Sequence, residues 1–298
     1  MVAASAGPGP VAVATLAPAN DGPRPLAVEA LWPTVVGVRL RVLAAGAGEP
    51  LLLLHGIGGS ADEWLGVVPR LAERFRVLAP DAPGHGWSEK PVGYRYTVES
   101  YVQMAVALMD TLGIGCAPAI AVSGGGVVAL ALALGYPERI SKLVLVDAAG
   151  LGREVAWRYR VATLPLARYA LRRARRREIE AFGRAMCYDR SRLPEGWVER
   201  RLRIWHSPGA VDAFIATARA GLSLRGQRFD FSGRLRELRQ PTLLIWGRQD
   251  PILPVAHALA AQRAIPHAEL HIFERCGHVP MWEYPQEFAE RVLAFLTA

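Results

Sequence analysis

The feature of the sequence that most constrains the fold is an uncharged stretch of 27 residues, 111–137. A transmembrane helix needs about 20 consecutive apolar residues, so the length alone would allow one. Pro118 and the glycine triplet 124–126 divide the stretch into two shorter apolar pieces, however. We therefore predict a buried strand, a tight turn and a buried helix, and no stable membrane insertion.

Apolar runs alternate with amphipathic segments along most of the chain. Leu51–Leu54 is a continuous apolar run ending in glycines, which is typical of a strand buried on both faces. Because such alternation requires helical crossovers between parallel strands, it predicts an α/β fold with a mostly parallel, twisted sheet flanked by helices. Val36 and Gly37 also predict the turn of an edge hairpin. Further strands are expected at 76–79, 117–122, 142–146, 241–246 and 269–273, and helices at 63–73, 97–112, 125–134, 254–264 and 285–296.

The middle of the chain has a different character. From 151 to 239 it consists of long arginine-rich segments with aromatic residues at helical spacing and no strand-like runs. We predict a helical insert there, which divides one α/β core into the parts 28–150 and 240–298. Residues 1–27 contain several prolines and no positive charge before Arg24, so they do not resemble a signal peptide and are expected to be a disordered tail.

Composition excludes several classes of protein. Hydrophobic residues make up 51% of the 298 residues, which excludes a disordered chain. The three cysteines, at 116, 187 and 276, are odd in number and far apart, so neither a disulfide framework nor a paired-cysteine metal site is available. No other clustered ligand pattern occurs, so we expect no metal and no cofactor. Because the cysteines form no disulfide framework, we expect a reducing compartment and therefore a cytoplasmic protein. We also expect a monomer or homodimer.

The net charge of +8 is unevenly distributed. Residues 151–240 hold 21 arginines against nine acidic residues, which leaves the rest of the chain with a net charge of −4. No helix-turn-helix, zinc or base-stacking pattern accompanies the arginines, so we expect no nucleic-acid partner. A solvated face of the insert and the attraction of acidic substrates both remain open as explanations of the run from Arg172 to Arg177.

Residues 117–126, APAIAVSGGG, have the pattern of a nucleophile elbow. Such an elbow is a strand, a strained tight turn around the nucleophile and a helix, with small residues two positions before and after. Ser123 occupies the central position, with Ala121 where glycine is commoner and Gly125 at the other small position. The sequence therefore predicts Ser123 as a nucleophile.

A serine nucleophile needs a general base and an acid that orients the base. Asp250 follows the predicted strand 241–246, and His278 follows the strand 269–273, so both are expected at the carboxyl edge of the sheet. We predict His278 as the base and Asp250 as the acid. Asp147, which also ends a strand, is the rival for the acid.

On these residues the chain resembles the α/β-hydrolases that carry a lid. The resemblance covers about residues 28 to 298, implies the α/β-hydrolase fold with the insert as lid, and implies an oxyanion hole formed by the backbone N–H groups of Ile57 and Gly124. It rests on five segments in the family's order: HGIGGS, DAPGHGWS, AVSGGG, WGRQDPILP and CGHVPMWEYP.

The resemblance implies hydrolysis of a small-molecule acyl substrate. Serine in the elbow argues against dehalogenases and epoxide hydrolases, which use aspartate there. HGIGGS is more similar to esterases, so we expect cleavage of small carboxylic esters, with Trp205 and Phe214 lining an acyl pocket. The segment after His278 is similar to C–C bond hydrolases acting next to a carbonyl on ring-cleavage products, which is the alternative. A ligand-binding protein without catalysis is a further alternative.

A dinucleotide-binding fingerprint competes for the same glycines. Gly56, Gly58 and Ala61 fit its spacing after a strand, and Asp81 lies about 20 residues on, where the ribose acid is expected. This interpretation leaves Ser123, Asp250 and His278 unexplained, and the fingerprint strand normally begins its domain, so we favour the hydrolase.

Overall fold

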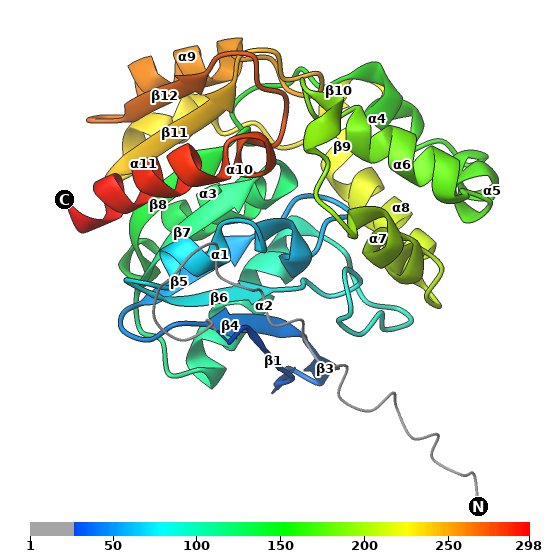
Figure 1. Ribbon diagram of the computed structural model, residues 1–298, viewed down its shortest axis with the longest axis horizontal. Helices are drawn as coiled ribbons and strands as arrows, with labels where there is room; N and C mark the ends of the chain where they lie inside the picture. The colour runs from blue at the N-terminus through cyan, green and yellow to red at the C-terminus, as the bar shows by residue number, and fades with distance from the viewer. Residues whose placement is uncertain (1–26) are drawn as a thin grey trace, which may run out of the picture.

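The computed structural model describes residues 27–298, so the tail predicted for 1–27 lies outside the described residues apart from Ala27. Eight strands form one sheet, and from β6 to β12 neighbouring strands are parallel (Figure 1). Only β1 and β4 run antiparallel to their neighbours at one edge. The strands are, in sheet order, β1 (Glu29–Leu31), β4 (Val42–Ala45), β6 (Arg76–Pro80), β5 (Pro50–Leu54), β7 (Ala117–Val122), β8 (Ile140–Val146), β11 (Thr242–Gly247) and β12 (Glu269–Phe273). The predicted parallel α/β sheet is confirmed.

Helices cover both faces of the sheet. The contacting pair α1 and α11 lies in front of it in Figure 1, and the contacting pair α2 and α3 lies behind. Helix α9 contacts β11 and β12. Their bounds are α1 (Val68–Leu71), α2 (Val98–Thr111), α3 (Gly124–Gly135), α9 (Ala256–Ala264), α10 (Pro280–Glu283) and α11 (Pro285–Thr297). In the described part of the chain no helix combines the length and the apolar character that spanning a bilayer requires.

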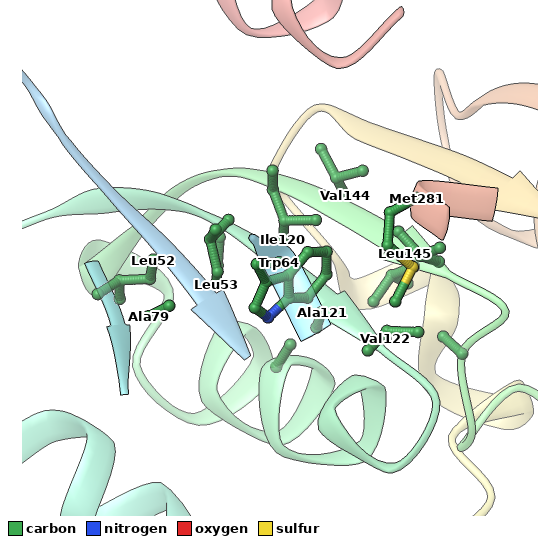
Figure 2. Close-up of a cluster of buried hydrophobic side chains, with 14 of the residues drawn as sticks. Leu52, Leu53, Trp64, Ala79, Ile120, Ala121, Val122, Val144, Leu145 and Met281 are labelled. Atoms are coloured by element: carbon green, nitrogen blue, oxygen red, sulfur yellow. The ribbon is translucent and has the colours of Figure 1, made fainter. Parts of the chain in front are cut away.

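The hydrophobic core lies between the sheet and these helices. Figure 2 shows side chains of β5, β7 and β8 gathered around the indole of Trp64, among them Leu53 and Ile120. All three of these residues are fully buried. The uncharged stretch 111–137 accounts for β7 and α3, which is why it is both long and apolar.

One predicted helix is divided in two. The segment 63–73 forms a short 3₁₀ helix, η1 (Ala61–Trp64), and the single turn α1. Gly66 lies between them, and Pro69 has no N–H to donate to a preceding turn, so a continuous helix would lose stability at both positions.

The segment between β8 and β11 is largely helical. It lies beside the sheet in Figure 1, with α5 at its outer end. Its elements are α4 (Trp157–Val161), α5 (Ala167–Arg172), α6 (Arg176–Arg184), η3 (Arg190–Arg192), α7 (Trp197–Trp205), α8 (Ala210–Gly221), β9 (Leu222–Ser223), β10 (Gly226–Gln227) and η4 (Ser232–Glu237). The small β9–β10 hairpin was not predicted. Another hairpin, β2 (Thr34–Val35) and β3 (Val38–Arg39), forms around the predicted turn at Val36 and Gly37.

Candidate active site

Ser123 occupies a strained turn between β7 and α3. Its φ of 53° and ψ of −124° lie outside the regions that non-glycine residues normally adopt. Three backbone hydrogen bonds hold this conformation: the Ser123 N–H donates to Val146, and the Ser123 carbonyl accepts from Gly126 and Ala149. Strain of this kind persists only where the surrounding structure fixes it. The Ser123 side chain is thereby held at the carboxyl edge of the sheet.

The glycines around Ser123 are required by close packing. A Cβ at Gly125 would lie 2.6 Å from the carbonyl oxygen of Leu54, and one at Gly56 would lie 2.9 Å from Cβ of Ser123. A Cβ at Gly124 would lie 3.0 Å from the backbone nitrogen of Ile57. The two predicted oxyanion-hole residues, Ile57 and Gly124, are therefore neighbours, and both line the same cavity as Ser123.

His278 lines this cavity as well and is hydrogen-bonded to Asp250. The distance between Nδ1 of His278 and Oδ2 of Asp250 is 2.8 Å. Since Asp250 accepts, the imidazole carries its proton on Nδ1 and leaves Nε2 as a base. Oδ1 of Asp250 accepts from the backbone N–H of Ile252 at 2.7 Å, so both carboxylate oxygens are fixed.

The loops that carry Asp250 and His278 pack tightly against each other. A Cβ at Gly247 would lie 1.8 Å from the carbonyl oxygen of Gly277, so only glycine fits there. Glu283, which is buried, accepts hydrogen bonds from the N–H groups of Gly277 and Asp189 at 2.6 and 2.9 Å. The His278 loop is thus held from β11, from α10 and from the insert.

Asp147, the other candidate for the acid that orients His278, lies close to Asp250. It is fully buried, its φ is 40°, and its Oδ1 accepts from the N–H of Gly247 at 3.0 Å. Burial, and after it the charge of Asp250, raise the pKa of Asp147 well above its ordinary value. The site therefore favours the protonated form of Asp147, in which a proton on the otherwise unpartnered Oδ2 can be donated to Asp250.

Asp147, Asp250 and His278 also form the kind of group that could hold a metal. One donor atom from each lies within 4.8 Å of the others. Two carboxylates and an imidazole suit several divalent cations. In this group, however, the raised pKa of Asp147 favours its protonated form, and the imidazole nitrogen donates to the carboxylate of Asp250. The chemistry of the group therefore fits a hydrogen-bonded chain better than a cation site.

The cavity of about 70 Å³ beside Ser123 contains two charged side chains that the sequence analysis did not single out. Burial raises the pKa of Glu63 to about 7, against the opposing effect of Arg201. The guanidinium of Arg201 lies 5.9 Å from the ring centre of Trp197 and 5.5 Å from that of Trp205, a cation–π arrangement. Its Nε has no hydrogen-bond partner among residues 27–298.

A larger cavity of about 110 Å³ adjoins the first one across Gly56, Ile57 and Gly124. Its lining is mainly aliphatic, and it includes two buried histidines, His55 and His85. Burial lowers the pKa of both, that of His85 to about 3, so they are neutral at physiological pH. The two cavities give the site one compartment lined by Glu63 and Arg201 and one mainly apolar compartment, in which Asp81 is paired with Arg41.

Two predicted substrate contacts lie elsewhere. Trp205 and Phe214 pack edge to face with ring centres 5.2 Å apart, and the Trp205 indole N–H donates to the carbonyl of Leu171. Neither residue lines the two cavities described above, because each is used to pack α7 against its neighbours. The insert residues that line the Ser123 cavity include Tyr159, Phe182, Met186, Trp197 and Arg201.

The dinucleotide interpretation is excluded by the surroundings of Asp81. Asp81 is fully buried, forms an ion pair with Arg41 at 2.7 Å and accepts the backbone N–H groups of Ala61 and Trp87. Its carboxylate is therefore occupied by the protein and cannot bind a ribose. Its role is to hold the HGIGGS loop.

The fold and the strained serine with its histidine and aspartate define a class of protein. The chain matches the alpha/beta hydrolase fold family over residues 49–285, which is well over half of its length. It therefore belongs to this family, and it is a hydrolase.

Three individual proteins show what the chain is similar to within this family. A 2-hydroxymuconate semialdehyde hydrolase of Pseudomonas sp. (strain CF600) is 33% identical over 276 residues, covering 87% of this chain and 91% of the relative. The structure of 2-hydroxy-6-oxo-6-phenylhexa-2,4-dienoate hydrolase from Rhodococcus sp. strain RHA1 matches with a TM-score of 0.79 at 27% identity, covering 91% of this chain and all of the other. A meta-cleavage product hydrolase from Pseudomonas fluorescens IP01 has a TM-score of 0.77 at 28% identity, covering 90% and 97%.

Proposed function

We propose that the protein is a serine hydrolase that cleaves a C–C bond next to a carbonyl in small, carboxylate-bearing dienoates or diketones. The observation that carries this proposal is Arg201, a buried cation in the Ser123 cavity whose Nε lacks a hydrogen-bond partner among the described residues. A buried charge is costly unless it is paired, so a substrate carboxylate is the natural partner. Relatives named for dienoate and semialdehyde hydrolysis support the same substrate class.

The roles of the remaining residues follow from their geometry. His278 removes the proton of Ser123 through Nε2, and Ser123 adds to the substrate carbonyl. Asp250 keeps the imidazole in the tautomer that this step requires. The negative charge that develops on the carbonyl oxygen is received by the N–H groups of Ile57 and Gly124.

Cleavage of a C–C bond differs from ester cleavage in its leaving group. An alkoxide leaves an ester, whereas a carbanion leaves a ketone, and the carbanion must be delocalised before His278 returns the proton to it. A 2-hydroxy-dienoate must first tautomerise, with its hydroxyl proton moving to the carbon next to the bond that breaks. The electron pair left by cleavage is then conjugated, through the remaining C=C bond, with the 2-oxo group beside the carboxylate. Arg201 stabilises negative charge at that end, which makes it useful in the transition state as well as in binding. Water then hydrolyses the acyl-enzyme with His278 as base.

The apolar cavity suits the other end of such a substrate. It begins at the oxyanion-hole residues Ile57 and Gly124 and offers an aliphatic lining with neutral histidines. An uncharged acyl substituent that enters it would lie outside the cavity that Arg201 lines. The helical insert, which supplies Tyr159, Phe182 and Arg201 to the charged cavity, would act as the lid of the site.

The test compares substrates and two variants of the same helix. We expect the protein to turn over a 2-hydroxy-6-oxo-dienoate with a higher kcat/KM than its methyl ester or a neutral p-nitrophenyl ester. Arg201→Gln should lower kcat/KM for the carboxylate substrate about a hundredfold, within the range for removing one partner of a buried charge pair. Arg203→Gln, at an exposed position of α7, should change it little.

Two outcomes would contradict the proposal. Faster turnover of neutral esters, unchanged by Arg201→Gln, would support ester hydrolysis, the first expectation from the sequence. Absence of covalent labelling by a fluorophosphonate probe would support a ligand-binding protein without catalysis. We expect labelling of the parent chain and none of Ser123→Ala.

A further inference from the structure

One segment of the insert combines basic and exposed apolar side chains. Residues 155–177, here called the basic segment, contain eight arginines and no acidic residue. The segment forms α4, α5 and the beginning of α6, and α5 lies at the outer end of the insert in Figure 1. None of this positive charge is balanced within the segment itself.

The same segment exposes large apolar side chains. Trp157 is 72% exposed and Leu166 is 77% exposed, and Leu164 and Tyr169 are exposed as well. These four are among only ten large hydrophobic side chains exposed in residues 27–298. Tryptophan and tyrosine beside arginine are typical of surfaces that lie in the headgroup region of a bilayer.

Ion pairing neutralises little of this charge. Arg168 and Arg172 share Asp212, and Arg176 pairs with Glu199, all through side chains that are about half exposed. Among the described residues Arg173, Arg175 and Arg177 are in no ion pair within 4.0 Å. Exposed pairs contribute little and weaken with salt, so the segment remains strongly positive.

We propose that the basic segment docks the protein on an anionic lipid surface. A second copy of the chain fits less well, because a symmetric contact would bring the same arginines face to face. A nucleic acid would satisfy the arginines but would leave Leu164 and Leu166 in water. Acidic headgroups and the upper acyl region satisfy both kinds of side chain.

On α4, the exposed side of the basic segment faces away from the catalytic cavity. Trp157 is exposed, whereas Tyr159, two residues later, lines the Ser123 cavity and lies 6.2 Å from the ring of Phe182. A molecule partitioned into the bilayer surface would therefore meet the protein near its site. The docking itself does not depend on the reaction proposed above.

The experiment measures co-sedimentation of the full chain with vesicles. We expect binding at 50 mM NaCl to phosphatidylcholine vesicles containing 30% phosphatidylglycerol, at least tenfold weaker binding to pure phosphatidylcholine, and a similar loss at 500 mM NaCl. Trp157→Ser with Leu166→Ser should weaken binding about tenfold at constant charge. Val92→Ser with Leu224→Ser, which removes exposed apolar side chains elsewhere, should leave it unchanged.

A second pair of variants separates local charge from total charge. Replacing Arg173, Arg175 and Arg177 by glutamine should reduce binding at least tenfold. Replacing three exposed arginines near the end of the insert by glutamine, at 225, 236 and 239, gives the same net charge and should reduce it much less. Fluorophosphonate labelling and thermal unfolding of each variant verify that it is folded.

Four results would overturn the proposal. Two concern vesicles: equal binding to neutral and anionic vesicles, and equal losses of binding in the two triple variants. The third is a concentration-dependent dimer that the Trp157 and Leu166 changes abolish. The fourth is tight RNA binding that depends on the arginines but not on Trp157 and Leu166. Because vesicle binding needs no turnover, Ser123→Ala should bind as the parent chain does. Failure of the proposed reaction and failure of docking are therefore distinguishable.

Discussion

Two aspartates at the carboxyl edge of the sheet show how surroundings decide what a residue does. Asp250 receives the N–H of Ile252 and the Nδ1 proton of His278, so its negative charge is satisfied. Asp147 has one N–H donor, from Gly247, and faces the charge of Asp250 without contact to solvent. Ionised carboxylates so close together repel, and the one with fewer donors more readily keeps its proton. The sequence predicts Asp250 as the acid with Asp147 as its rival, and in the structure it is Asp250 that is hydrogen-bonded to His278.

We expect Asp250→Asn to lower kcat about 10⁴-fold, because an amide stabilises the wrong tautomer of His278. Asp147→Asn should lower kcat less than tenfold, since an amide is neutral and can donate to Asp250 as the protonated acid does. Steady-state kinetics of the two variants on one substrate measure the difference. The reverse order of losses would mean that Asp147 orients the base.

The raised pKa of Asp147 should also make the free energy of unfolding depend on pH. The unfolded chain releases this proton near the ordinary pKa of 3.8, whereas the folded chain retains it to a much higher pH. The free energy of unfolding should therefore fall as pH rises above about 4, until the pKa in the folded state is reached. Asp147→Asn removes this contribution, so urea titrations between pH 5 and 8 should show a smaller decline. An unchanged decline would mean that Asp147 is ionised in the folded protein.

We expect Glu63 to make the affinity for a carboxylate substrate depend on pH. Because burial raises its pKa to about 7, it is neutral below that pH and leaves the charge of Arg201 free for a substrate carboxylate. Above it, the Glu63 carboxylate offsets Arg201 and repels the substrate. We expect KM for a carboxylate substrate to rise as pH passes through about 7. Glu63→Gln should abolish that rise, and KM for a neutral ester should show none in either protein.

At the scale of the elements, the sequence predicts best where one strong pattern acts alone. The apolar run 117–122 predicts β7 to the residue, and the strand predicted at 269–273 coincides with β12. The predicted strand–turn–helix pattern coincides with the turn at Ser123 between β7 and α3. The prediction of one continuous helix over 63–73 is wrong. It followed the helical spacing of the apolar residues and gave too little weight to the local effects of Gly66 and Pro69. Tertiary contacts are what hold the two short turns in place.

Arg201 was missed because the insert contains so many arginines that one buried member does not stand out. A signal was nevertheless present, since Trp197, Arg201 and Trp205 are spaced four residues apart and therefore share one face of α7. The same two tryptophans explain part of the error at Trp205. Its ring lies under the guanidinium of Arg201 and packs edge to face with Phe214, so it supports the cavity without lining it.

The contact between the Asp250 and His278 loops predicts a steric requirement at Gly247. Gly247→Ala would bring a methyl group to 1.8 Å from the carbonyl oxygen of Gly277, so one of the two loops must move. We expect a loss of about 2 kcal/mol or more in the free energy of unfolding, together with reduced kcat. Gly135→Ala, where no atom lies within 4 Å of the added Cβ, should be neutral or slightly stabilising. Equal effects in thermal unfolding would show that the close contact does not constrain the loops.

At the scale of the whole molecule, the charge is divided between two parts. The insert region 151–240 has a surplus of twelve positive charges, and the rest of the chain has a net charge of −4. The arginines from 172 to 177 lie at the outer end of the insert, on or beside α5 and α6, whereas Arg201 lies inside the cavity. Under the proposed function, contact with the substrate and long-range attraction would therefore be carried by different arginines.

This separation gives a prediction for the run Arg172, Arg173, Arg175, Arg176 and Arg177. Replacing all five by glutamine should lower kcat/KM for a carboxylate substrate several-fold at ~0.01 M ionic strength, where the Debye length is ~30 Å. At ~0.15 M the length falls to ~8 Å, so the difference from the parent chain should nearly vanish. Neutral esters should be unaffected at both salt concentrations, because they gain nothing from the field of the insert. Stopped-flow or initial-rate measurements across this range of salt, on one anionic and one neutral substrate, provide the comparison. Equal losses on both substrates would show instead that the arginines hold the insert together, which their pairs with Asp212 and Glu199 would then explain.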